Sequence, residues 1–149
     1  MMTQLVKDLQ PYKPPVIVQE DASIAEMAEL FVNHPSMHYL CLVDKAGVLR
    51  GLIARKKIFQ AIYTHHLPPD SMVSRLFTLI TSETASDLLV EHIITIGEDD
   101  TIEDLINKMM AHDLDSLPVL DNVGKPLGFV NIEMILKLWL DAQRREEGV

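Results

Sequence analysis

Hydrophobic residues along this chain occur in two patterns, short runs that are typical of buried strands and helical spacing that is typical of amphipathic helices. A β-branched run at 16–18 predicts a short strand. Ser23, with Glu26 three residues later, has the spacing of a helix capping box, and the helix is predicted to end before Pro35. The apolar residues at helical spacing between them are Ile24, Met27, Ala28 and Phe31.

Two more strands and a second helix complete this pattern. The strands are predicted at 39–43 and 48–53, on either side of the turn at 44–47, whose glycine favours a hairpin. A helix is predicted from Arg55 to about residue 64. The first half of the chain therefore has the order strand, helix, strand, strand, helix.

The second half repeats the first. Residues 16–24 align with 94–102 at an offset of 78, and residues 40–44 align with 117–121 at an offset of 77. The elements predicted from this repeat are a strand at 93–96, a helix at 101–111, strands at 116–120 and 126–130, and a helix from 132 to about 144. We therefore expect an α/β fold of the α+β type, in which two pseudo-symmetric β-α-β-β-α repeats pack through their sheets.

A break separates the two repeats. Leu67-Pro68-Pro69-Asp70 ends the first half, and residues 71–80 then have helical spacing of Met72, Leu76 and Leu79 or Ile80. The predicted domains are a first repeat at 1–66, a linker with a helical insert at 67–83, and a second repeat at 84–149.

Composition excludes several classes of function. The 149 residues suit one compact domain, and the net charge of −9 argues against nucleic acid or an anionic membrane as a partner. No apolar stretch reaches the roughly 20 residues of a membrane span, and no secretory signal begins the chain. The single cysteine, Cys41, lies in an apolar run and is expected to be a core residue in a reducing compartment. We expect a cytoplasmic protein.

Charge is unevenly distributed. No Lys or Arg occurs between Arg75 and Lys108, where the chain is strongly acidic. Residues 45–75 hold six basic residues and one acid, a local balance of +5. An anionic small molecule would find its most favourable field in that basic segment.

These residues resemble a family, the paired cystathionine-beta-synthase (CBS) domain, or Bateman module. The resemblance is carried by a leader at 86–90, the strand at 94–96, Leu117-Pro118-Val119-Leu120-Asp121, and Gly128-Phe129-Val130-Asn131 before the last helix. The first repeat follows the pattern more loosely, with Lys7-Asp8-Leu9 as its leader and Gly51-Leu52-Ile53-Ala54 before its helix. The resemblance covers roughly residues 6–142.

The resemblance implies a regulatory module that binds adenosine-containing ligands in clefts between the repeats. AMP, ADP, ATP or S-adenosylmethionine would be regulatory ligands, with no cofactor required. Members commonly pair as homodimers, and the largely apolar helix around Trp139 is expected to form the dimer contact. The candidate ligand-binding residues are Ile17, Val18, Ala54, Arg55, Lys56 and Lys57 in the first repeat and Thr95, Ile96, Pro118, Asn131 and Met134 in the second.

The chain departs from the family at the residues that bind ribose. Nucleotide-binding members usually carry Ser or Thr three residues after the motif glycine and Asp six residues after it. This chain has Ala54 and Lys57 at those positions in the first repeat, and Asn131 and Met134 in the second. Methionine does not replace a carboxylate that accepts two hydroxyls, so the second site is expected to be the poorer one.

Two of these substitutions still allow a ligand. Asn131 can donate and accept hydrogen bonds, and Lys57 projects a cation from the first turn of a helix, where anions are already favoured. Recognition of a phosphate by Arg55-Lys56-Lys57 is one interpretation, and a solvated helix start is the other.

Other site chemistries have weaker support. His34 and His38 flank Pro35, and no histidine spacing suits a metal. The acids at 98–104 lack the spacing and the glycine of a calcium loop, and they suit a helix N-terminus. No nucleophile motif or phosphate-binding glycine loop is present, so an enzyme is not expected.

The sequence therefore predicts a stand-alone regulatory CBS pair that binds an adenosine-type nucleotide or related anion and signals to an unidentified effector protein. The alternative is a ligand-free module that only dimerises or docks, with degenerate nucleotide sites.

Overall fold

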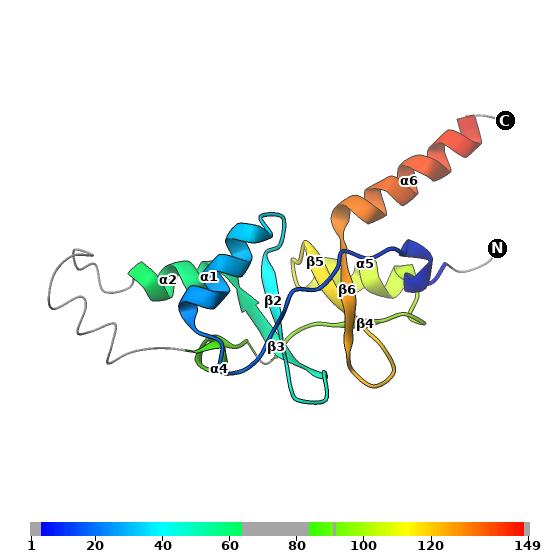
Figure 1. Cartoon of the computed structure of the whole chain (residues 1–149). Helices are drawn as coiled ribbons and strands as arrows, with labels where there is room; N and C mark the ends of the chain where they lie inside the picture. Colours follow the sequence, from blue (N-terminus) through cyan, green and yellow to red (C-terminus); the bar gives the residue numbers. More distant parts are fainter. Residues whose placement is uncertain (1–3, 64–83, 91, 148–149) are drawn as a thin grey trace, which may run out of the picture. The chain divides into compact units, whose positions relative to one another are not determined.

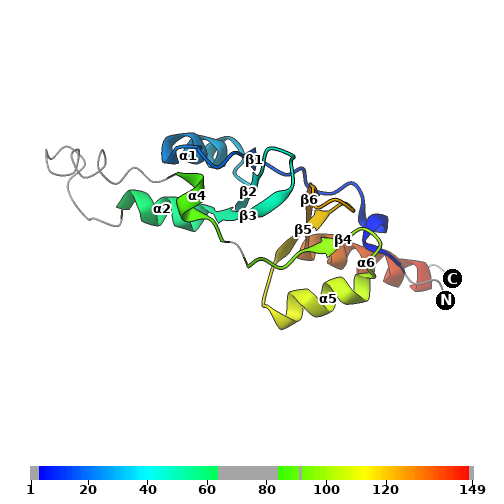
Figure 2. The same ribbon diagram turned by 90° about the horizontal axis from the view of Figure 1, so that it is seen from below.

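The computed structural model describes residues 4–63, 84–90 and 92–147, which form two compact units (Figures 1 and 2). The first unit spans residues 16–93, and the second joins the N-terminal segment, up to residue 15, to the chain from residue 94 onward. Each unit contains the strands and helices of one repeat. The helix predicted at 71–80 lies outside the described residues.

In its described residues, the first unit has a three-stranded mixed sheet, two helices and a short additional helix. The strands lie in the order β1-β2-β3, with β1 parallel to β2 and β3 antiparallel to it. Ser23 caps the first helix as predicted, because its hydroxyl accepts a 3.1 Å hydrogen bond from the Glu26 N–H. The elements are β1 (Ile17–Val18), α1 (Ile24–Asn33), β2 (Tyr39–Val43), β3 (Leu49–Ala54), α2 (Arg55–Tyr63) and α4 (Ala85–Leu88).

The second unit repeats this plan. Its strands lie in the order β4-β5-β6 with the same parallel and antiparallel pairing, which confirms the predicted β-α-β-β-α repeats. Thr101 caps its first helix through a 3.0 Å bond from the Asp104 N–H. The elements are the 3-10 turn η1 (Val6–Leu9), β4 (Ile96–Gly97), α5 (Ile102–Ala111), β5 (Ser116–Leu120), β6 (Pro126–Asn131) and α6 (Ile132–Glu147).

Two predicted boundaries differ from the structure by more than one residue. The strand expected at 93–96 is β4, which consists of Ile96–Gly97 because only these two residues pair with β5. The last helix was expected to end near 144 but continues to Glu147, through polar residues that are good helix formers.

Aspartates at equivalent positions hold the two hairpin turns. One carboxylate oxygen of Asp44 accepts hydrogen bonds from the N–H groups of Ala46 and Val48, at 2.9 and 3.0 Å. Asp121 accepts from Val123 and Lys125, each at 2.9 Å. Gly47 and Gly124 take positive φ angles of 85° and 90°, which explains the recurrence of glycine in both turns.

Each core lies between a sheet and its helices. In the first unit the fully buried side chains include Met27, Leu40 and Ile53. In the second they include Leu105, Leu117 and Val130. Apolar residues of the strands and apolar residues at helical spacing on α1 and α5 therefore meet in each core.

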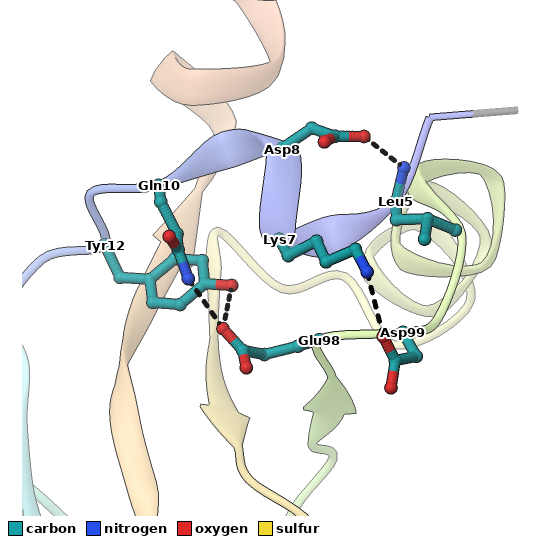
Figure 3. Close-up of polar contacts among 7 residues, drawn as sticks. All are labelled: Leu5, Lys7, Asp8, Gln10, Tyr12, Glu98 and Asp99. Atoms are coloured by element: carbon teal, nitrogen blue, oxygen red, sulfur yellow. Dashed lines mark hydrogen bonds and ion pairs between the residues drawn. The ribbon is translucent and has the colours of Figure 1, made fainter. Parts of the chain in front are cut away.

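The N-terminal leader, defined here as residues 5–13, belongs to the second unit (Figure 3). Its backbone follows the chain after β4, with hydrogen bonds from Val6 N–H to Asp100 O at 2.8 Å and from Lys7 N–H to Glu98 O at 3.0 Å. The Gln10 amide donates to the Glu98 carboxylate at 2.8 Å, and Lys7 pairs with Asp99 at 3.4 Å.

The second leader, residues 84–90, packs on the first unit in the equivalent way. Ala85 N–H donates to Ala22 O at 3.0 Å, and Ser86 N–H donates to Glu20 O at 3.1 Å. Each sheet is therefore completed by a leader that lies, in the sequence, before the other repeat.

Both leaders cross a sheet at a glycine. A Cβ atom on Gly128 would lie 2.5 Å from the Lys13 carbonyl oxygen, and one on Gly51 would collide with the Val90 carbonyl oxygen and the Leu89 side chain. The close approach of the leader backbone requires glycine at both positions, and at Gly128 the positive φ of 155° also favours glycine.

Candidate functional site

Four of the six candidate ligand-binding residues of the first repeat, Ala54, Arg55, Lys56 and Lys57, follow one another where β3 leads into α2, whereas Ile17 and Val18 lie in β1 on the other side of β2. Ala54, the last residue of β3, lies opposite Tyr39, and the Arg55 N–H donates to His38 O at 3.1 Å at the first residue of α2. Ile17 in β1 is 42% exposed, whereas Val18 is buried in the core. Ile17 therefore offers apolar surface in β1, at the edge of the sheet opposite β3, and Val18 belongs to the core.

Helix α2 begins with three exposed cations. Arg55, Lys56 and Lys57 are all exposed, and none of them forms an ion pair with the described part of the chain. Ala54 at the preceding position has no side-chain acceptor for the N–H groups of the first helical turn. The Arg55 N–H is bonded to His38, but the positive side chains and the remaining N–H groups of the first turn both favour an anion.

The start of α6, which is the equivalent position in the second repeat, has a side-chain cap. Asn131 is 8% exposed, and its side-chain oxygen accepts a 3.0 Å hydrogen bond from the Met134 N–H, so it caps α6. The Met134 side chain packs against the core of the second unit. The cap therefore satisfies the Met134 N–H, and the first turn of α6 presents no cation.

The remaining candidates of the second repeat are part of its sheet. Ile96 and Pro118 are almost fully buried, in β4 and β5. The carbonyl oxygen of Thr95 accepts a 2.8 Å hydrogen bond from the Lys108 ammonium of α5. The Thr95 carbonyl is therefore used within the unit.

Sequence reasoning missed Lys108. It is the first basic residue after Arg75, at the end of a long acidic stretch, and this isolation was the available signal. Its role is structural, because its ammonium group joins α5 to the chain that enters β4.

Catalytic and metal chemistry find little support in the described residues. Burial raises the pKa of the Cys41 thiol from 9.0 to about 12, so the thiol is protonated at neutral pH and unreactive. Among residues 4–63, 84–90 and 92–147, no group of three or more His, Cys, Asp or Glu side chains could hold a metal ion. Over the same residues, no helix combines the length and hydrophobicity that crossing a bilayer requires.

Two proteins are similar to this chain in sequence, one over a small part of its length and one over most of its length. L-aspartate semialdehyde sulfurtransferase of Methanocaldococcus jannaschii is 27% identical over 135 residues, which cover 91% of this chain but 23% of the relative. The chain thus spans about a quarter of that enzyme. An uncharacterized protein of the same organism is 26% identical over 146 residues and is matched over 85% of both chains. Similarity to the enzyme is therefore confined to one part of it.

A solved structure shares the fold over nearly the whole chain. The CBS domain pair of protein MJ0100, in complex with 5′-methylthioadenosine and S-adenosyl-L-methionine, superimposes with a TM-score of 0.69 at 26% identity. The match covers 95% of this chain and 99% of that one. The family model of the CBS domain matches residues 6–64 and again residues 85–141. The chain belongs to the CBS domain family and contains two CBS domains, one from each repeat of its sequence.

Proposed function

We propose that this chain is a regulatory CBS pair that binds a phosphorylated adenosine-type ligand, such as AMP, ADP or ATP, at the start of α2. In this proposal the binding of the ligand is signalled to an effector protein, and the chain itself catalyses no reaction. The observation that carries this proposal is the uncapped start of α2 with its three exposed cations, Arg55, Lys56 and Lys57. A related CBS pair holds two adenosine compounds, which supports the ligand class.

Lys57 is the residue on which the proposed specificity depends. It stands where nucleotide-binding members of the family usually carry the aspartate that binds ribose. An ammonium group there attracts phosphate and cannot accept hydrogen bonds from ribose hydroxyls. We therefore infer that the phosphate group anchors the ligand, and that unphosphorylated adenosine binds weakly.

The second repeat is proposed to bind no ligand of its own. Asn131 is engaged as the cap of α6, Met134 packs on the core, and the Thr95 carbonyl is held by Lys108. These same observations favour the alternative function, a module with degenerate nucleotide sites that only dimerises or docks. A homodimer is part of both proposals, with Trp139 of α6 exposed and available for the contact.

Calorimetric titration with AMP, ADP, ATP, S-adenosylmethionine, NAD and cyclic dinucleotides, with and without magnesium, tests the proposal. We expect one of the adenine nucleotides to bind, and Lys57→Glu to weaken it by more than about tenfold, because a hydrogen bond to a charged group contributes about 1.5–3 kcal/mol. Lys45→Glu is the matched control. It makes the same charge change on an exposed lysine in the hairpin turn, and it should leave the affinity nearly unchanged.

Two results would count against the proposal. Equal losses in Lys57→Glu and Lys45→Glu would indicate a general effect of charge and not a contact. The absence of binding by every nucleotide, in a preparation free of co-purified ligand, would leave the docking module as the function.

A further inference from the structure

Equivalent carboxylates in the two repeats have different surroundings. Glu20 comes shortly after β1 and Glu98 directly after β4, at the offset of 78 that relates the two repeats. The guanidinium group of Arg50 lies 3.8 Å from the Glu20 carboxylate. The residue equivalent to Arg50 is Leu127, and within the described part of the chain no ion pair involves Glu98. The first repeat thus pairs this carboxylate with a cation, and the second repeat has a leucine in place of that cation.

The N-terminal leader encloses the surroundings of Glu98 in a pocket, called here the leader pocket. Its volume is about 540 Å³, and it is lined by Gln10, Pro11, Tyr12, Glu98 and Leu127, all of the second unit. Pockets of this volume accommodate small organic molecules or single side chains. Tyr12, Pro11 and Leu127 give the pocket apolar walls, and the carboxylate of Glu98 is the only charged group among its lining residues.

The leader pocket depends on the length of the N-terminal leader. Equivalent backbone contacts hold Lys7 and Lys13 of this leader to the second unit, and Ser86 and Val90 of the second leader to the first unit. The first pair lies six residues apart and the second pair four. The additional length falls in the stretch that contains residues 10–12, which form the wall of the pocket.

Two donors of the leader orient the Glu98 carboxylate. The Gln10 amide and the Tyr12 hydroxyl both donate to Oε1, at 2.8 and 2.9 Å. Figure 3 shows the other oxygen, Oε2, turned away from both donors, and no hydrogen bond from the described residues reaches it. A bidentate guanidinium group needs both oxygens of a carboxylate, whereas an ammonium group needs only one. The geometry at Glu98 therefore favours an ammonium group.

We propose that the leader pocket binds a primary ammonium group on an unbranched alkyl stem, which is the chemistry of a lysine side chain or of a free alkylamine. The ammonium group donates to Oε2 of Glu98, in the role that Arg50 has in the first unit. The stem lies along the apolar walls, as lysine stems do on apolar surface. The leader pocket shares no residue with the proposed nucleotide site at the start of α2.

A nuclear magnetic resonance titration of the full chain tests the proposal. The probes are butylammonium chloride and Nα-acetyl-lysine methylamide, with sodium chloride at equal ionic strength as the reference. We expect saturable shifts of the amide signals of residues 10, 12, 98 and 127. The control is the same lysine derivative acetylated on Nε, which keeps the stem, has no charge and should cause no such shifts.

The two probes distinguish the sources of the ammonium group. The blocked lysine carries the peptide groups of a protein, so its binding would assign the ligand to a lysine side chain of a partner. Binding of butylammonium alone would assign the ligand to a free amine. The absence of saturable shifts with both probes, or equal shifts with the acetylated control, would overturn the proposal.

A matched pair of variants tests the carboxylate. Glu98→Gln removes the charge and keeps an oxygen for Gln10 and Tyr12, so it should weaken binding of the amine at least about tenfold. Glu20→Gln makes the same change at the equivalent position and should leave the affinity unchanged. Equal losses in the two variants would overturn the proposal, because they would show a general effect of charge. Neither variant should change the affinity for a nucleotide, so this proposal and the proposed function fail independently.

Leu127→Arg tests the comparison of the repeats directly. It recreates the arrangement of Glu20 and Arg50, and we expect the new guanidinium group to pair with Glu98 and to abolish binding of the amine. Val123→Arg is the control, because it adds the same charge at an exposed residue of the hairpin turn and should reduce the affinity only slightly. Circular dichroism verifies that both variants are folded. A folded Leu127→Arg protein that binds the amine as the wild type does would overturn the proposal.

Discussion

The hydroxyl of Tyr12 donates a 2.9 Å hydrogen bond to the carboxylate of Glu98, which ties the N-terminal leader to the chain just after β4 (Figure 3). Gln10 donates to the same carboxylate oxygen. The leader is thus held to the second unit by side chains as well as by its backbone, although the sequence places it before the first repeat.

Removal of the Tyr12 hydroxyl should destabilise the second unit. We expect Tyr12→Phe to lower the free energy of unfolding by about 1 kcal/mol, because one partly buried hydrogen bond to a charged group is lost. Hydrogen exchange, followed residue by residue, should increase along residues 94–131 and remain unchanged along residues 16–54. An increase spread evenly over both stretches would contradict the assignment of the leader to one unit.

The same hydroxyl gives a pH dependence with a defined sign. Burial, together with the hydrogen bond to Glu98, raises the pKa of Tyr12 from 10.0 to about 12. Between about pH 10 and about pH 12, Tyr12 has lost its hydroxyl proton in the unfolded chain but keeps it in the folded chain. The free energy of unfolding therefore falls as the pH rises through this range. The stability difference between the wild type and Tyr12→Phe should therefore shrink between about pH 9 and about pH 11.5 in urea unfolding. A constant difference would exclude this linkage.

The glycines beneath the two leaders should not tolerate a side chain. Gly51→Ala and Gly128→Ala should each destabilise the protein by about 1–3 kcal/mol, because the new Cβ would meet the backbone oxygen of a leader. Gly97→Ala is the matched control, since its Cβ would meet only the carboxylate of Asp100, at 3.3 Å. Denaturation midpoints measure the three effects. An effect of Gly97→Ala as large as the other two would show that leader contact is not the cause.

The cap of α6 offers a test of the difference between the two repeats. Asn131→Ala should lower the free energy of unfolding by about 1 kcal/mol, because the Met134 N–H loses its acceptor. The converse change, Ala54→Asn, should stabilise α2 by a similar amount. Chemical denaturation compares them, and a destabilising Ala54→Asn would mean that the start of α2 does not need an acceptor.

Cys41 should be protected from chemistry as long as the protein is folded. Its thiol is completely buried, and its pKa is raised to about 12. At about pH 8.5 a thiol-reactive dye should leave the native protein unmodified and react fully in denaturant. Rapid labelling of the native protein would contradict the burial of β2.

Local sequence signals determined most of the secondary structure. Ser23 and Thr101 mark helix starts because a hydroxyl at that position accepts from an N–H three residues on. Asp44 and Gly47 mark a hairpin by the same kind of short-range geometry, and short apolar runs mark β2 and β5. Where pairing with a distant strand sets the length of an element, as in β4, the prediction was less accurate.

The candidate site was predictable only in part. The sequence located Arg55, Lys56 and Lys57 at a helix start, because the repeat and its turn glycines determine where α2 begins. It could not show that Asn131 would cap α6, because an asparagine at that position can serve a helix or a ligand equally well. It also could not identify Lys108, because Lys108 donates to the backbone oxygen of Thr95 and every residue type carries such an oxygen.

The sequence by itself determined the repeat, the order of strands and helices and the positions of the glycines, because these depend on interactions between residues close along the chain. The tertiary structure decided which leader completes which sheet. Leu5 to Lys13 and Thr84 to Val90 have similar local patterns, and either could pair with either sheet as far as sequence shows. Their backbones pair with strands far away in the chain, and such contacts depend on chain path and close packing at Gly51 and Gly128 rather than on local preference.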